Sequence, residues 1–213
     1  MTPVLYVDQN NPSPEVVEQA AKTLRSQGVL VLPTDSVYGL ACAATPANPA
    51  HGRIFDIKHR DRAQTLPWFV ADASDLDRYG AQVPAWAHRL AARFWPGALT
   101  LVVRASSEVP PEYAHAFDGG PSTIALRVPG SELVRALVRE VGPLAQTSAN
   151  THGQASATSG ESVEPAIARE ADLVLDGGAA PLAVASTIVE ATGKAPRILR
   201  EGALSGHEVL LAV

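Results

Sequence analysis

Cationic side chains in two parts of this chain could bind an anion. Lys58, Arg60 and Arg62 lie within five consecutive residues, and Arg127 ends the mainly apolar run 122–127. Lysine offers phosphate a point charge and arginine offers a bidentate fork, so the first cluster could clamp a triphosphate. Arg127 could pair with a carboxylate or a phosphate, because a lone buried cation is costly without an anion. A solvated helix end and a structural salt bridge are the respective alternatives.

Short polar segments follow two of the apolar runs, and their hydroxyl groups could orient a ligand. Residues 33–40 contain Thr34, and residues 146–150 contain Ser148 and Asn150. Polar residues at strand ends are where open α/β sheets form ligand crevices. Small hydroxyl residues also let a phosphate or a base approach the backbone closely. Taken alone, each segment could equally be a surface turn.

The apolar periodicity predicts the helices that would carry these segments. We expect helices at about 13–28, 48–58, 85–94 and 131–142. Serine begins the first and the last of them, and a hydroxyl at that position accepts hydrogen bonds from the first free amides. Glycine follows both, as is common where a helix ends.

Apolar runs predict the strands between the helices. We expect strands at 29–32, 66–70, 99–103, 123–128, 144–146, 173–175, 187–190 and 197–199. The first run is apolar throughout, which is typical of a strand covered on both faces. Strands and helices alternate through much of the chain, so the predicted class is α/β. Because no linker or repeat interrupts the pattern, residues 1–213 are predicted to form a single domain.

The composition limits the classes of function. The chain has 213 residues and a net charge of −5, and only 5% of its residues are aromatic, which argues against a general nucleic-acid-binding surface. The single cysteine, Cys42, suits a reducing compartment and is predicted to be buried. No signal peptide or membrane-spanning run is recognised, so a cytoplasmic location without membrane contact is expected. The six histidines lack ligand spacing, which predicts no metal site of the protein's own.

Seven segments of the sequence, taken in order, resemble the motifs of the YrdC-like family of threonylcarbamoyl-AMP synthases. They are 33–40, Lys58 with Arg60, 94–101, 126–129, 148–150, 186–189 and 198–202. Each segment is short, but their order and spacing across about 30–202 make the resemblance specific.

The resemblance implies an α/β fold in which a twisted mixed sheet and flanking helices surround a deep cavity. Thr34, Arg127 and Ser186 would contact a threonine substrate. The residues that would bind the nucleotide are Lys58, Arg60, Gln64, Thr123, Ser148, Asn150, Ser156 and Arg200. Lys58 and Arg60 would also be the catalytic cations. Longer members carry an additional C-terminal domain, and this chain resembles the short, single-domain form.

The implied reaction converts L-threonine, bicarbonate and ATP into threonylcarbamoyl-AMP and pyrophosphate. Mg²⁺ would accompany ATP, and downstream tRNA-modifying proteins would use the product to make threonylcarbamoyladenosine in tRNA. The sequence leaves direct contact with tRNA open. The alternatives are an RNA-binding module of the same fold and a paralogue that acts on another amino acid or carbamoyl donor.

Three positions depart from the pattern of this family. Gln64 stands where many members have asparagine, Phe69 where many have a histidine near the threonine, and Gln146 where the residue is often small. These departures bear on the amino-acid specificity more than on the adenylation chemistry.

Overall fold

The helices begin and end where the local chemistry of the sequence favours it. The computed structural model describes residues 2–62, 64–116 and 120–213. The hydroxyl of Ser13 accepts a hydrogen bond from the amide of Val16, and Gly142 ends a later helix with a φ of 82°. The helices are α1 (Pro14–Arg25), α2 (Pro49–Lys58), α3 (Asp75–Tyr79), α4 (Ala85–Phe94), η1 (Pro111–Tyr113), α5 (Glu132–Val141), α6 (Pro165–Glu170) and α7 (Gly206–Leu211).

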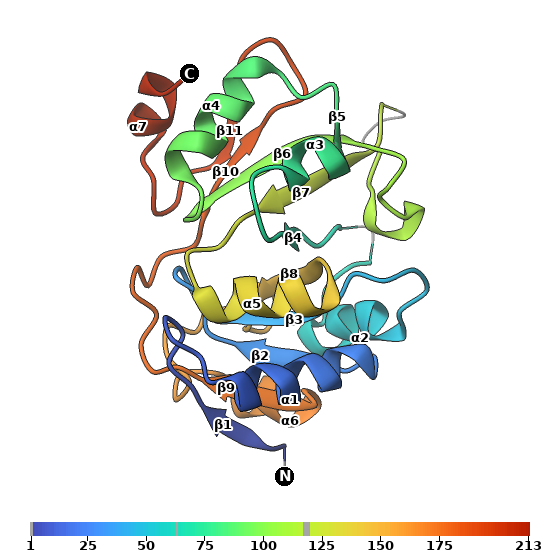
Figure 1. Cartoon of the computed structure of the whole chain (residues 1–213), viewed down its shortest axis with the longest axis vertical. Helices are drawn as coiled ribbons and strands as arrows, with labels where there is room; N and C mark the ends of the chain where they lie inside the picture. Colours follow the sequence, from blue (N-terminus) through green and yellow to red (C-terminus); the bar gives the residue numbers. More distant parts are fainter. Residues whose placement is uncertain (1, 63, 117–119) are drawn as a thin grey trace.

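One mixed sheet runs through the described chain (Figure 1). Its strands are β1 (Val4–Tyr6), β2 (Leu30–Leu32), β3 (Gly39–Ala43), β4 (Trp68–Phe69), β5 (Gly80–Ala81), β6 (Leu99–Ala105), β7 (Thr123–Arg127), β8 (Leu144–Ser148), β9 (Leu173–Asp176), β10 (Thr187–Glu190) and β11 (Arg197–Arg200). The order is β1-β9-β2-β3-β8-β4-β7-β6-β10-β11, and β5 pairs with β6. Strands β4 and β7 are parallel, whereas β4 and β8 are antiparallel.

Alternation along the strands divides the apolar core between the two faces of the sheet. Leu40 and Cys42 of β3 belong to a cluster that includes residues of α2, α3, α4 and α6. Ala41 and Ala43 of the same strand belong to a second cluster with residues of α1 and α5. Figure 1 shows α1 and α5 side by side over this part of the sheet. Successive side chains of a strand point to opposite faces, so one strand supplies both clusters.

The face of the sheet that α1 and α5 cover bears polar side chains farther along, beyond α5. Leu101 of β6 and Leu126 of β7 belong to the first cluster. Their neighbours Thr100 and Arg127, on the opposite face, line a cavity instead of packing against a helix. The register of the sheet therefore decides which residues form the core and which form the cavity.

Most of the predicted elements are confirmed. The α/β class is right, and α1, α2, α4 and α5 match the four predicted helices. The strand predicted at 66–70 is wrong in length, because only Trp68–Phe69 pair and Pro67 lacks an amide hydrogen for the ladder. Elements that were not predicted are β1, β3, α3, β5, η1, α6 and α7. Cys42 is buried as expected, and burial raises the pKa of its thiol to about 12.

None of the helices in the described ranges is both long and apolar enough to cross a membrane.

We predict that Leu137→Ala lowers the free energy of unfolding by about 2–5 kcal/mol, because it removes a fully buried side chain of α5 from the second core cluster. Urea unfolding measures the change. Leu210→Ala is the matched control: Leu210 lies on α7 and is 56% exposed, so its loss should change the stability by less than about 0.5 kcal/mol. Equal effects of the two substitutions would contradict this description of the core.

Candidate active site

Most of the predicted site residues converge on one cavity of about 310 Å³. The predicted residues that line it are Thr34, Arg60, Thr123, Arg127, Ser148, Ser156, Ser186 and Arg200. Three predicted residues are not on the lining: Lys58, Gln64 and Asn150. The volume lies at the lower end of the range usual for small-molecule sites.

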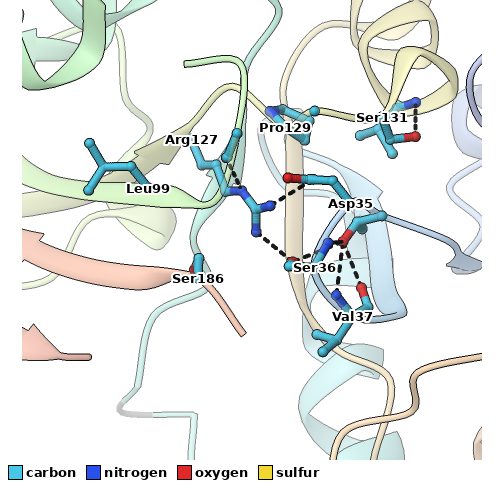
Figure 2. A network of polar contacts seen from close by, with 12 residues as sticks. Asp35, Ser36, Val37, Leu99, Arg127, Pro129, Ser131 and Ser186 are labelled. Atoms are coloured by element: carbon cyan, nitrogen blue, oxygen red, sulfur yellow. Dashed lines mark hydrogen bonds and ion pairs between the residues drawn. The ribbon is translucent and has the colours of Figure 1, made fainter. Parts of the chain in front are cut away.

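Arg127 is held from three sides by neighbouring polar groups (Figure 2). Its Nε donates to the carbonyl of Gly97 at 2.8 Å, and one terminal nitrogen donates to the Ser36 hydroxyl at 2.8 Å. The other terminal nitrogen donates to the Asp35 carboxylate at 2.7 Å, in an ion pair whose side chains are 3% and 14% exposed. Arg127 therefore makes the salt bridge considered above and also lines the cavity. A guanidinium has five N–H groups, so two remain without a partner in the described chain.

Close packing fixes Asp35 against the loop that follows β7. A Cβ atom at Gly130 would lie 3.0 Å from the Asp35 side chain, so glycine permits this approach. The Asp35 carbonyl also accepts a hydrogen bond from the amide of Leu182 at 3.0 Å. The carboxylate that balances Arg127 is thus part of a rigid arrangement.

Thr34 stabilises the turn between β2 and β3. Its hydroxyl donates to the carbonyl of Val37 at 2.7 Å and accepts hydrogen bonds from the amides of Ser36 and Val37. Thr34 is buried, with 1% exposure. Its hydroxyl therefore positions Ser36, which in turn binds Arg127.

Two further arginines place positive charge on the lining. Arg60 donates from Nε to Gln64 at 2.6 Å and from a terminal nitrogen to the Thr147 hydroxyl at 3.1 Å. Arg200 donates to the carbonyl of Ser186 at 2.8 Å. Burial lowers the pKa of Arg60; the pKa of Arg200 is lowered by burial and by the charge of Arg127. In both arginines the cause named first is burial, which disfavours the charged form of the guanidinium.

Lys58 lies behind the lining and stabilises the loop that follows β8. Its ammonium donates to the carbonyls of Ser148 and Asn150, both at 2.5 Å, and the residue is 2% exposed. Burial lowers the pKa of Lys58 to about 8, with a further lowering by Arg60. The Asn150 side chain donates to the carbonyls of Thr151 and Gln154, within the same loop. Both residues thus shape the loop that begins after Ser148.

The charge on the lining selects the kind of ligand. Three arginines and no carboxylate occur among the described residues that line the cavity, although the chain as a whole is acidic. Hydroxyl-bearing residues and Gln146 are the other polar residues on the described lining. Such a cavity suits a molecule that carries several negative charges.

Comparison with known proteins shows the family of this chain. The Sua5_yciO_yrdC family model, described as telomere recombination, matches residues 22–202. The chain belongs to the Sua5/YciO/YrdC family.

Two relatives in this family have closely similar structures. The structure of Pyrococcus abyssi Sua5 complexed with L-threonine has a TM-score of 0.90 and 32% identity, over 100% of this chain and 61% of that one. Escherichia coli YciO has a TM-score of 0.86 and 28% identity, over 99% of this chain and 100% of that one. The fold is therefore that of the family.

Curated sequences of the family include a threonylcarbamoyl-AMP synthase from P. abyssi, which is 35% identical to this chain over 191 residues and 89% of its length. The chain spans 55% of that relative and 58% of the Bacillus subtilis threonylcarbamoyl-AMP synthase. It therefore corresponds to little more than half of these two proteins.

Several residues of the site were not predicted from the sequence. Asp35 and Ser36 bind Arg127, and Thr147 binds Arg60. Asp35 could have been found, because a lone buried cation requires an anion and Asp35 follows a buried strand. Thr147 and Gly97 lie in the segments 146–150 and 94–101 noted in the sequence, but their contacts with Arg60 and Arg127 arise only in the folded chain.

We predict that Asp35→Ala lowers the free energy of unfolding by about 3–5 kcal/mol, because it leaves the Arg127 charge buried and unpaired. Urea unfolding measures the loss. Glu18→Ala is the control: Glu18 is 67% exposed and pairs with Arg25 on the surface, so its removal should cost less than about 1 kcal/mol. A loss no larger than that of the control would show that Arg127 does not depend on Asp35.

We predict that Lys58 gives the stability a distinctive pH dependence. Its pKa of about 8 in the folded protein lies below the ordinary 10.5, so the unfolded chain binds more protons between these values. The free energy of unfolding should therefore rise with pH above 8, by at most about 1.4 kcal/mol per pH unit. Subtracting the profile of Lys58→Arg, whose side chain stays charged, isolates this contribution. If the difference in free energy of unfolding between wild type and Lys58→Arg stays constant from pH 7 to 10, the lowered pKa of Lys58 is refuted.

Proposed function

We propose that this protein forms threonylcarbamoyl-AMP and pyrophosphate from L-threonine, bicarbonate and ATP, as a nucleotidyltransferase. The observation that carries the proposal is the cavity shared by Arg60, Arg127 and Arg200. An amino-acid carboxylate and a triphosphate are the anions that such separated cations would bind together. The structure of P. abyssi Sua5 complexed with L-threonine, whose fold matches at a TM-score of 0.90, supports threonine as the amino acid.

The chemistry needs positioning and charge more than a protein nucleophile. The threonine amine attacks bicarbonate, water leaves, and an N-carboxylate forms. An oxygen of this carboxylate then attacks the α-phosphorus of ATP, and the bond to pyrophosphate breaks. Holding the two reactants in line and balancing negative charge on the phosphates lowers the barrier for both steps.

The residues divide between the two substrates. The two free N–H groups of Arg127 would bind the threonine carboxylate, and Ser186 faces the same cavity. Arg60 and Arg200 would neutralise the phosphates, with Thr123, Ser148 and Ser156 beside the nucleotide. Lys58 would act indirectly, because its ammonium binds the carbonyls of Ser148, at the end of β8, and of Asn150, in the loop that follows. Gln64 and Asn150 would likewise position Arg60 and this loop.

We propose that Mg²⁺ enters with ATP. No group of three histidine, cysteine or acidic side chains that could hold a metal ion occurs among the described residues, and the described lining has no carboxylate. The residues thus do not fit a metal held by the protein itself. Phosphate oxygens and water are the usual ligands of this ion, and none of the steps above is routed through it.

The product would pass to proteins that modify tRNA, in a cytoplasmic setting. A paralogue that acts on another amino acid is the second candidate, because Phe69 and Gln146 line the cavity. This chain also covers the whole length of the E. coli YciO structure, whereas it spans 55% of the P. abyssi threonylcarbamoyl-AMP synthase. Pyrophosphate release from ATP and bicarbonate, measured with each amino acid in turn, separates the candidates. Release that ignores threonine would overturn the proposed reaction.

We predict that Arg60→Ala lowers the turnover by about ten- to a thousandfold, the usual effect of removing one charge-stabilising group. The assay is threonine-dependent pyrophosphate release. Arg62→Ala is the matched control, because Arg62 lies two residues away, is 64% exposed and pairs with Asp56 outside the cavity. Arg62→Ala should keep near-normal turnover. Similar rates in the two variants would remove Arg60 from the mechanism.

A further inference from the structure

The side chain of Gln146 reaches the cavity with its amide unpaired. Gln146 is half-buried on β8, and its backbone amide donates to the carbonyl of Pro67 at 2.9 Å. Its side-chain Oε1 lies 3.5 Å from the position that a Cβ atom would take at Gly39, so the amide extends over this glycine. Within the described chain, no residue donates to this amide or accepts from it.

The hydroxyl groups near Arg127 contrast with this amide, because they already have partners. The hydroxyl of Thr34 has hydrogen bonds within its turn, and that of Ser36 accepts from Arg127. The Ser186 hydroxyl lies 2.9 Å from that of Thr100. In the Gln146 side chain, both the NH₂ donor group and the carbonyl acceptor remain available to a ligand.

The register of the sheet places this amide near an aromatic ring and the carboxylate-binding cation. Phe69 of β4 pairs with Leu144 on β8 and with Arg127 on β7, and Gln146 follows Leu144 by two residues. Phe69, Gln146 and Arg127 therefore share one face of neighbouring strands. The Arg127 guanidinium carbon lies 5.6 Å from the centre of the Phe69 ring. All three residues line the cavity.

We propose that Gln146 recognises the β-hydroxyl group of the amino-acid substrate while Phe69 contacts its methyl group. This inference rests on the proposed function, in which Arg127 binds the substrate carboxylate. A side chain that extends from there meets an apolar ring and an unpaired amide, which suit the methyl and hydroxyl groups of threonine. Valine has the same shape but no hydroxyl, so its binding would dehydrate the amide without replacing the hydrogen bonds. Serine would leave the contact with Phe69 unfilled.

The test compares threonine with valine in the wild type and in Gln146→Met, which keeps the length of the side chain but removes its polar atoms. We expect kcat/KM for threonine to exceed that for valine by at least about a hundredfold in the wild type, since a site built to bind a hydroxyl strongly rejects analogues without it. In Gln146→Met this ratio should fall by roughly tenfold or more, because kcat/KM decreases for threonine and increases for valine.

Gln19→Met, on the exposed surface of α1, is the control and should leave the ratio unchanged. If Gln146→Met turns over too slowly to measure, calorimetric binding of L-threonine and L-valine gives the same comparison. An unchanged preference in Gln146→Met, in either assay, overturns the role of Gln146. The wild type distinguishes this failure from that of the proposed function: threonine-dependent pyrophosphate release with an unchanged preference refutes only the role of Gln146. Absence of that release in the wild type refutes the proposed reaction itself.

Discussion

The burial of the Arg127 charge is the interaction on which the rest of the site depends. A guanidinium that is 3% exposed requires anions and acceptors, and Asp35, Ser36 and the Gly97 carbonyl supply them. These partners come from the turn after β2 and from the segment before β6, so one side chain ties distant parts of the sheet together. Because the guanidinium is held in place and two of its N–H groups have no partner in the described chain, the proposed function would find it already oriented for a ligand carboxylate.

The charge of the cavity is opposite to that of the whole chain. An acidic protein that gathers three arginines on one lining has a local field that differs from its net charge of −5. Arg127 has the Asp35 carboxylate as a partner, whereas Arg60 and Arg200 donate to neutral oxygens, which orient each guanidinium but do not cancel its charge. Binding of an anionic ligand would supply the missing counter-charge. Lys58 differs from the three arginines. Its ammonium donates to two backbone carbonyls and so stabilises the loop beside the cavity.

Local sequence patterns predicted most helices and strands, but they did not predict all the contacts that the site residues make in the folded chain. Apolar periodicity and capping serines located α1 and α5, and an uninterrupted apolar run located β2. The strand β3 was missed because its sequence begins inside a polar turn. Motifs placed Arg60 and Arg127 in the site, but the direction of Lys58 could not be predicted, since its acceptors lie about ninety residues away on a loop fixed by tertiary packing. The unpaired amide of Gln146 is likewise visible only in the folded sheet.

A crystal structure of the protein with L-threonine and a non-hydrolysable ATP analogue tests the central claim most directly. The account predicts that the threonine carboxylate lies within hydrogen-bonding distance of Arg127, with the Arg127–Asp35 ion pair intact, and that the phosphates lie against Arg60 and Arg200. Density for both ligands outside this cavity, or a threonine carboxylate bound by a different cation, would contradict it.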